Sequence, residues 1–388
     1  MAPIGKKKAR KSGPRFIDPD LHVFEPKDLW QRYIAPKYRD QAPIGTDNFI
    51  MDQNVMHDGK YICRSGLPPM VEELVHDSLA HHGRGAEFKD FIRRGFDSSV
   101  QIAAMDAEGI DKAVMFPTRG FYALGKEYDD DGLAAAIARA YNDWMVEFCA
   151  RDPSRMFAVG LIAPQSVELA IDEVKRMTNE LGFKGVYLRP NPVRRRNWNN
   201  PAYDPLWREI ERAGLPVTFH EGWPHQLPAA AADRFDGRFE DLWLTEHVLC
   251  HPVEMMYAAT CMIMGGVLER FPGLKVAFLE ANCSWAPYLL WRMDEHFEHR
   301  ESYAKKHFSK LPSEYFRRQC FVAIEADEGL GVQAARDIGT DTVVFSTDFP
   351  HEDSRWPHAK EAFLELPFDD AARQKILWDN PARLYALG

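Results

Sequence analysis

Short apolar segments recur along the chain and alternate with longer stretches in which apolar residues stand three or four positions apart. Runs such as Ala113-Val114-Met115-Phe116 and Thr342-Val343-Val344-Phe345 contain almost no polar residue, a pattern typical of parallel strands that are covered on both faces. Eight such segments are predicted as strands, near residues 16–23, 112–116, 157–162, 185–189, 216–220, 275–280, 320–324 and 342–346.

The stretches between these segments predict helices. Residues 132–150 place apolar side chains on one helical face, and residues 167–181 and 205–213 behave in the same way. Gly182 and Gly214 follow the last two stretches, where a glycine commonly ends a helix. Residues 255–271 predict one further long helix. Eight strands that alternate with helices predict a (β/α)8 TIM-type barrel of the α/β class.

The chain is predicted to carry a basic N-terminal tail over residues 1–15, followed by a single barrel domain over residues 16–388. Two long insertions interrupt the barrel, one at about residues 33–95 after the first strand and one at about residues 221–254 after the fifth. Loops of that length in a compact barrel are commonly lids or subunit contacts. We therefore expect a homo- or hetero-oligomer.

The bulk composition narrows the class of partner. The 388 residues carry a formal net charge of −10, which argues against nucleic acid, because a phosphate-binding surface needs a basic excess. No apolar run reaches the length of about 20 residues that a membrane helix needs, so no membrane partner is expected. The six cysteines show no C-x-x-C pair and no secretory leader precedes them, which predicts free thiols in a cytoplasmic protein.

Ionisable residues stand at the ends of several predicted strands. Asp20 and His22 alternate in the first strand, so both side chains can face the barrel mouth. His220 ends the fifth strand and Asp348 follows the eighth, again directly after apolar residues. Barrel enzymes place their catalytic groups at this face, and a carboxylate is costly to bury alone. The four residues together predict a divalent metal site.

Two further stretches give the chain a family resemblance, the run IMGGVLERFPGLKVAFLE at residues 263–280 and NPARLY at residues 380–385. The chain resembles the amidohydrolase superfamily from Phe16 to Leu387, and within it the branch of aminocarboxymuconate-semialdehyde decarboxylase and related benzoate-type decarboxylases. The resemblance implies a metal ion bound by Asp20, His22, His220 and Asp348. It also implies hydrolysis or non-oxidative decarboxylation of a small carboxylated molecule.

The sequence departs from the pattern of that branch at two points. Asp20-x-His22 stands where His-x-His is frequent, and Glu280 stands where the decarboxylases carry an acid/base histidine. Glu280 is predicted to act as a base or as a further metal ligand, and His251 can complete a second metal site with it. So many oxygen donors make Fe or Mn as credible as Zn, with one or two ions per chain.

Glu280, Asp348 and Arg189 are the predicted catalytic residues. Arg189 closes the fourth strand and can bind a substrate carboxylate, with a structural salt bridge as the other interpretation. Glu25 and His351 lie just beyond two ligand strands, where they can orient the imidazoles.

Two other functions are compatible with the sequence. The first is a non-haem dinuclear iron or iron–manganese oxygenase that hydroxylates a small amino or carboxylic acid. The second is a non-catalytic barrel that supports an active partner subunit.

Overall fold

The computed structural model describes residues 13–46, 55–62, 85–220, 248–351 and 354–388. Most of the predicted basic tail, Cys63 and most of the second insertion therefore lie outside the described residues. The other five cysteines are free thiols, as expected. No helix within the described ranges is long and apolar enough to cross a membrane.

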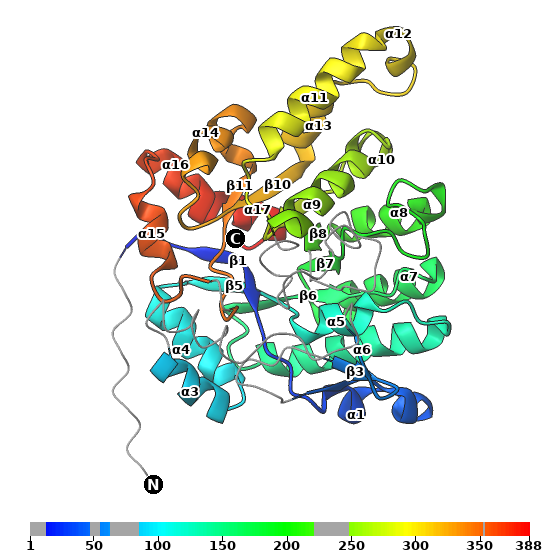
Figure 1. Ribbon diagram of the computed structural model, residues 1–388, viewed down its shortest axis with the longest axis vertical. Helices are drawn as coiled ribbons and strands as arrows, with labels where there is room; N and C mark the ends of the chain where they lie inside the picture. Colours follow the sequence, from blue (N-terminus) through cyan, green and yellow to red (C-terminus); the bar gives the residue numbers. More distant parts are fainter. Residues whose placement is uncertain (1–12, 47–54, 63–84, 221–247, 352–353) are drawn as a thin grey trace, which may run out of the picture.

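Eight parallel strands form the centre of the molecule and are neighbours in the order in which they occur in the chain (Figure 1). They are β1 (Ile17–His22), β5 (Lys112–Phe116), β6 (Met156–Leu161), β7 (Gly185–Leu188), β8 (Val217–His220), β9 (Val276–Leu279), β10 (Cys320–Ile324) and β11 (Val343–Phe345). The last strand returns to the first, because the His22 backbone N–H donates to the Phe349 carbonyl, 2.8 Å away. The predicted barrel is confirmed, with strand ends within two residues of the predicted ones.

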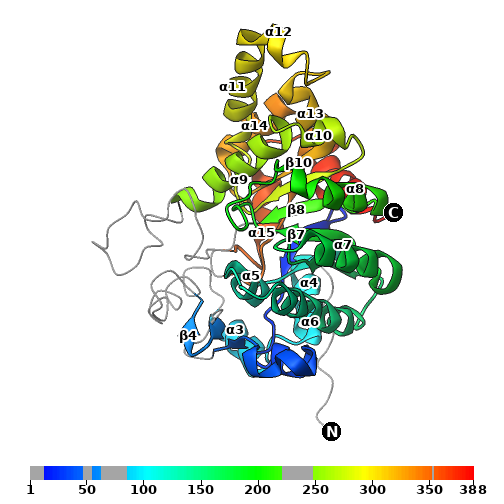
Figure 2. The same ribbon diagram turned by 90° about the vertical axis from the view of Figure 1, so that its right-hand side faces the viewer.

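Helices follow the strands and cover the outside of the barrel (Figure 2). The longer ones are α4 (Ser98–Glu108), α6 (Asp131–Cys149), α7 (Val167–Arg176), α8 (Asp204–Ala213), α9 (Val248–Ile263), α11 (Ala286–His299) and α14 (Gly329–Ile338). Shorter helices are α1 (Leu29–Tyr33), α3 (Gly85–Arg93), α5 (Arg119–Gly125), α10 (Val267–Arg270), α12 (Glu301–Ala304), α13 (Pro312–Gln319), α15 (Ala359–Glu365), α16 (Asp370–Gln374) and α17 (Asn380–Tyr385). The chain between β1 and β5 adds a small antiparallel sheet of β2 (Ile44–Gly45), β3 (Val55–His57) and β4 (Lys60–Tyr61).

One predicted helix is wrong in its extent. Residues 255–271 were expected to form a single helix, but α9 begins earlier, at Val248, and ends at Ile263, and α10 begins only at Val267. The break lies at Gly266, whose φ of 74° belongs to the left-handed region that ends helices and favours glycine. The early start of α9 also means that His251 belongs to a helix.

The first strand is irregular where the site begins. Its register with β5 shifts between Asp18 and Leu21, so β1 carries an extra residue there. Pro19 lies in this bulge, where its missing N–H removes no ladder bond, and its carbonyl accepts a hydrogen bond from Tyr385 Oη at 2.8 Å. Bulges of this kind redirect side chains, and here all six residues of β1 are buried.

Candidate metal centre

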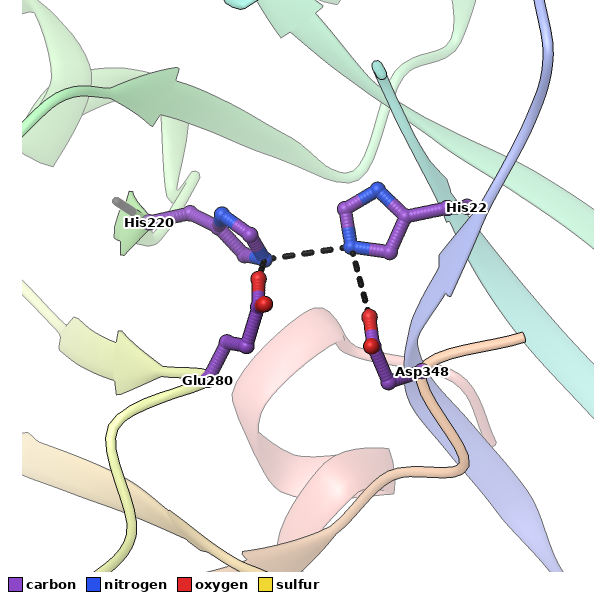
Figure 3. A group of neighbouring side chains, drawn as sticks. All are labelled: His22, His220, Glu280 and Asp348. Carbon is purple, nitrogen blue, oxygen red and sulfur yellow. Dashed lines mark hydrogen bonds and ion pairs between the residues drawn. The ribbon is translucent and has the colours of Figure 1, made fainter. Parts of the chain in front are cut away.

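Four side chains from distant parts of the chain point toward one another at the carboxyl ends of the strands (Figure 3). His22 and His220 are the last residues of β1 and β8, Glu280 directly follows β9, and Asp348 lies just beyond β11. One donor atom from each of the four lies within 4.8 Å of the donor atoms of the others. A group of two imidazoles and two carboxylates at this spacing can hold a divalent metal ion.

The two imidazoles face each other through their Nε2 atoms. His22 Nδ1 lies 2.7 Å from the Pro117 carbonyl oxygen, so this nitrogen carries the ring proton and His22 Nε2 keeps its lone pair. That lone pair points at His220 Nε2, 3.1 Å away. Phe121 stacks on the His220 ring at 5.0 Å and meets the His22 ring edge-on at 5.4 Å, which fixes both rings. The lone pair of His22 Nε2 therefore faces either a proton on His220 Nε2 or a bound cation.

Asp20 gives a second indication that a cation binds at this site. Its Oδ1 lies 3.3 Å from His22 Nε2 and its Oδ2 lies 3.3 Å from His220 Nε2. Both oxygens are buried, and their described partners are these two imidazole nitrogens. A buried carboxylate is strongly destabilised unless a positive charge compensates it, and a protonated His220 ring or a metal ion can supply that charge. The residues present therefore fit a divalent ion.

The pKa values of these groups follow from their shared burial and charge. Burial acts to raise the pKa of Asp20, but the imidazoles of His220 and His22 outweigh it and hold the pKa well below its usual range. Burial and the neighbouring His351 ring lower the pKa of His22 to about 4. The carboxylates of Asp20 and Glu280 overcome burial at His220 and raise its pKa well above the usual value. Without a metal ion, His220 is thus the protonated imidazole of the pair.

Two of the cluster residues have an unusual backbone conformation. Glu280 has a φ of 48° and Asp348 a φ of 55°, in the left-handed region that favours glycine. A side chain in that region costs about 1–2 kcal/mol. Such strain concentrates at functional sites, because the surrounding structure has to hold it in place. Glycine at these two positions would relieve the backbone strain, but it would remove the two carboxylates from the cluster.

A chain of hydrogen bonds holds Asp348 from behind. His351 Nδ1 lies 2.9 Å from Asp348 Oδ1, and His351 Nε2 lies 3.1 Å from Thr118 Oγ1. The neutral imidazole can therefore donate to the carboxylate through Nδ1 and accept from the threonine hydroxyl through Nε2. The buried Glu25 carboxylate fixes this segment in turn, since it accepts the backbone N–H groups of Thr118, Arg119 and Gly120.

Asp18 lies beside the cluster but is turned toward the last strand. Its carboxylate accepts hydrogen bonds from Thr347 Oγ1 at 2.6 Å and from the Thr347 backbone N–H at 3.2 Å. Burial raises the pKa of Asp18 to about 8, against these hydrogen bonds. Asp18 thus ties β1 to the segment that carries Asp348. In a regular strand Asp18 would share a face with Asp20 and His22, and the bulge between Asp18 and Leu21 separates it from them.

The cluster opens into a cavity of about 570 Å³. Glu280 and Asp348 line it, and so does His251, whose Nε2 lies 3.7 Å from Glu280 Oε1. Among the described lining residues, Arg355 carries the one permanent positive charge, and its Nη2 lies 2.5 Å from Asp327 Oδ2. The volume suits a small organic molecule. Sequence reasoning missed Arg355, because no hydrophobic pattern marks a residue in the loop after β11.

Arg189, the predicted carboxylate binder, lies elsewhere. It lines a separate, mostly apolar cavity of about 20 Å³, which is too small for a carboxylated substrate. Its Nη1 donates to the carbonyls of Leu124 and Gly125, and its Nη2 lies 3.4 Å from Glu127 Oε1. These contacts tie the end of β7 to α5, in line with the structural interpretation. A role in substrate binding stays a prediction.

Known proteins resemble this chain in sequence over most of its length. A family model described as "Amidohydrolase" matches residues 17–387. Gamma-resorcylate decarboxylase of Rhizobium radiobacter is 28% identical over 339 residues, which cover 82% of this chain and 95% of that protein. The 2-amino-3-carboxymuconate-6-semialdehyde decarboxylase of Dictyostelium discoideum is 25% identical, over 69% of this chain and 70% of its own length.

Solved structures show the same fold. An amidohydrolase of Mycobacterium avium subsp. paratuberculosis K-10 superposes with a TM-score of 0.75 at 25% identity, over 97% of this chain and all of that one. A dihydroxybenzoic acid decarboxylase of Polaromonas sp. JS666, solved with bound manganese and the inhibitor 2-nitroresorcinol, gives a TM-score of 0.64. At 24% identity, covering 82% and 94% of the two chains, this second likeness shows the fold alone.

Proposed function

The chain belongs to the amidohydrolase family, and from that premise we propose that it is a metal-dependent, non-oxidative decarboxylase of a small carboxylated aromatic molecule. One observation carries the proposal: two imidazole Nε2 atoms and buried carboxylates converge at the edge of a cavity of substrate size. The relatives reported above are decarboxylases. They support this reaction over the oxygenase alternative, and they favour it over hydrolysis at the same site.

We assign the metal ion to Asp20, His22, His220 and Asp348. These side chains supply two nitrogen and several oxygen donors, a mixed set that suits Mn²⁺, Fe²⁺ or Zn²⁺. A bound divalent ion would stabilise negative charge on the substrate oxygens. The protein's own part is to hold the donors in place, and Phe121 does so by packing on both imidazoles.

Decarboxylation also needs a proton at the carbon that loses carbon dioxide. The carbon–carbon bond breaks, its electron pair stays on the ring carbon, and a proton must be delivered to that carbon. Asp348 lines the cavity and is oriented by His351, so we assign proton delivery to Asp348. Glu280 contacts His220 at 2.8 Å and is held as a carboxylate, because the charges of His220 and His251 keep its pKa well below the usual range against burial.

The substrate would occupy the cavity between the cluster and Arg355. Arg355 lines this cavity, and its guanidinium is exposed and paired with Asp327. A guanidinium binds a carboxylate or phenolate oxygen through paired N–H groups. We therefore propose that Arg355, rather than Arg189, binds the anionic substituent of the substrate that does not face the metal.

The direct test offers a panel of hydroxybenzoates to the full-length protein loaded with Mn²⁺, including 2,6-dihydroxybenzoate and 5-carboxyvanillate. Released carbon dioxide and the decarboxylated product are measured, and the chelated protein serves as the control. We expect release that depends on the metal ion. Release that survives complete chelation would contradict the proposal. Cleavage of the corresponding esters or amides without any decarboxylation would replace it with a hydrolase.

A further inference from the structure

Three neighbouring strands of the barrel each lead into an acidic residue that lines the cavity. Glu280 directly follows β9, Glu325 directly follows β10, and Asp348 lies just beyond β11. Strand β10 lies between the other two, and all three carboxyl ends lie at one face of the barrel. The metal-binding cluster contains Glu280 and Asp348 but not Glu325. Glu325 therefore faces the molecule that occupies the cavity.

The loop that carries Glu325 is attached to the loop after β9. The Glu328 carboxylate accepts the backbone N–H groups of Cys283 at 3.0 Å and of Ser284 at 2.9 Å. The same carboxylate accepts the backbone N–H of Glu325 at 3.2 Å. One side chain thus joins the two loops and holds the backbone at Glu325 in place.

The loop is also attached on its other side, to the segment after β11. Asp327 Oδ2 lies 2.5 Å from Arg355 Nη2. Asp327 and Glu328 therefore anchor the loop in both directions, while the Glu325 side chain, which is half-buried, lines the cavity. A group that is held in place before binding adds affinity, because little ordering is needed when the ligand arrives.

The charge of the cavity wall indicates which kind of group Glu325 binds. Among the described lining residues, four are carboxylates and one, Arg355, carries a guanidinium. Asp327 pairs with this guanidinium, and a metal ion would offset the carboxylates that bind it. Negative charge remains at Glu280 and Glu325. Such a wall favours a substrate substituent that donates hydrogen bonds and carries no negative charge.

An amino group meets this requirement better than a hydroxyl or a methyl group. A phenol hydroxyl can lose its proton, which a nearby metal ion promotes, and the resulting oxygen anion would be repelled by Glu325. An amino group stays neutral or gains a proton, so it keeps its N–H donors. A methyl group of similar size would displace water from the carboxylate without offering a hydrogen bond.

We propose that Glu325 selects a substrate with an amino group, which donates a hydrogen bond to the Glu325 carboxylate. The substrate class is then an amino-substituted aromatic acid, whose reacting carboxylate lies at the metal ion and whose amino group points to the end of β10. This role of Glu325 rests on the proposed function for its reaction, but ligand binding tests it separately. The competing role of Glu325 is to support the loop, which would not discriminate between substituents.

The experiment compares amino, hydroxyl and methyl substituents at the 4 and the 5 position of salicylate, with the full-length protein loaded with Mn²⁺. Isothermal titration calorimetry gives Kd, and released carbon dioxide gives kcat/KM. At one of the two positions, the parent protein is expected to bind the amino compound about 10-fold or more tightly than the methyl compound, and more tightly than the hydroxyl compound. Glu325→Leu is expected to lose this preference. Glu325→Gln should keep part of it, because the amide oxygen still accepts a hydrogen bond.

The matched control is Glu298→Gln, which removes an exposed carboxylate on α11 and should keep the preference of the parent protein. The ratio of two Kd values for one protein compares ligands at the same fold and metal content. A purely structural role of Glu325 would therefore leave that ratio unchanged.

The outcomes separate the role of Glu325 from the proposed function. No amino preference in the parent protein, or an equal preference in the parent protein and Glu325→Leu, would overturn the role of Glu325. If carbon dioxide is released without any amino preference, the proposed function stands alone. If the amino compounds bind selectively but release no carbon dioxide, the role of Glu325 in binding stands and the proposed decarboxylation is wrong.

Discussion

The two sides of the metal centre are built in different ways. On the deep side, Asp20, His22 and His220 belong to strands and have no solvent exposure. On the cavity side, Glu280 follows a strand in a left-handed conformation, and His251 comes from a helix; their side chains are 15% and 8% exposed. The deep side is fixed by the barrel itself. The cavity side depends on a turn and on α9, so it can determine which substrate binds without disturbing the barrel.

The largest effect should come from the deep side. His220→Ala removes a nitrogen donor and leaves Asp20 buried without its neighbour, so we expect loss of bound metal and a fall in kcat of about 10³-fold or more. Metal analysis and the decarboxylation assay measure both. His57→Ala is the matched control, because His57 is also buried but lies in the β2–β4 sheet. A His220→Ala protein with full metal content would show that the deep side does not hold the ion.

Removal of the hydrogen bond from His351 to Asp348 should have an intermediate effect on metal binding. His351→Phe keeps a ring that can stack on His22, where the centroids lie 4.0 Å apart, but deletes the hydrogen bonds to Asp348 and Thr118. We expect Mn²⁺ affinity to fall about 10–100-fold, which isothermal titration calorimetry measures. His358→Phe, an exposed position on the same segment, should bind Mn²⁺ as the parent does. Equal affinities for both variants would remove His351 from the account.

A smaller effect is expected at Arg355 in the cavity lining. Arg355→Gln should raise KM for the carboxylated substrate about 10-fold, with kcat and metal content little changed, because it removes one charged hydrogen-bonding partner of the substrate. Arg292→Gln is the control, since Arg292 forms a comparable exposed ion pair with Glu295 on α11. A fall in kcat at unchanged KM would place Arg355 in the chemistry instead of in binding.

The smallest expected effect is the release of a proton from His220, but not from His22, when the metal ion binds. His220 has its pKa raised and is protonated without metal at neutral pH, whereas His22, with a pKa of about 4, is already neutral. Metal binding must displace the His220 proton, so affinity for the first ion should rise with pH, with about one proton released per ion. Calorimetry in buffers of different ionisation enthalpy measures that number. Release of no proton, or of two, would contradict the assigned difference.

The barrel could be predicted because its strands are continuous apolar runs that end sharply. The sharp strand ends also located His220 and Asp348. The carboxyl ends of all the parallel strands lie at one face of the barrel, so an ionisable residue at such an end lies at that face. The break between α9 and α10 was not predicted, because the apolar spacing continues through Gly266 and only the backbone shows its left-handed conformation.

The sequence does not predict the direction of a side chain beyond the end of a strand. Arg189 and Glu280 both stand where a strand ends, yet Arg189 turns toward the Leu124 and Gly125 carbonyls and Glu280 turns into the cluster. No period governs these residues, because the alternation of a strand stops with its last hydrogen bond. Arg355 lies in a loop, and only the folded cavity brings it to the site.

Anomalous diffraction at the manganese edge, on crystals of the full-length protein reloaded with Mn²⁺, locates the bound ion itself. We expect a strong peak beside the Nε2 atoms of His22 and His220, within bonding distance of Asp20 and Asp348. Density without a peak at the facing imidazoles, or with manganese only at surface positions, would contradict the assignment of this barrel mouth as a metal centre.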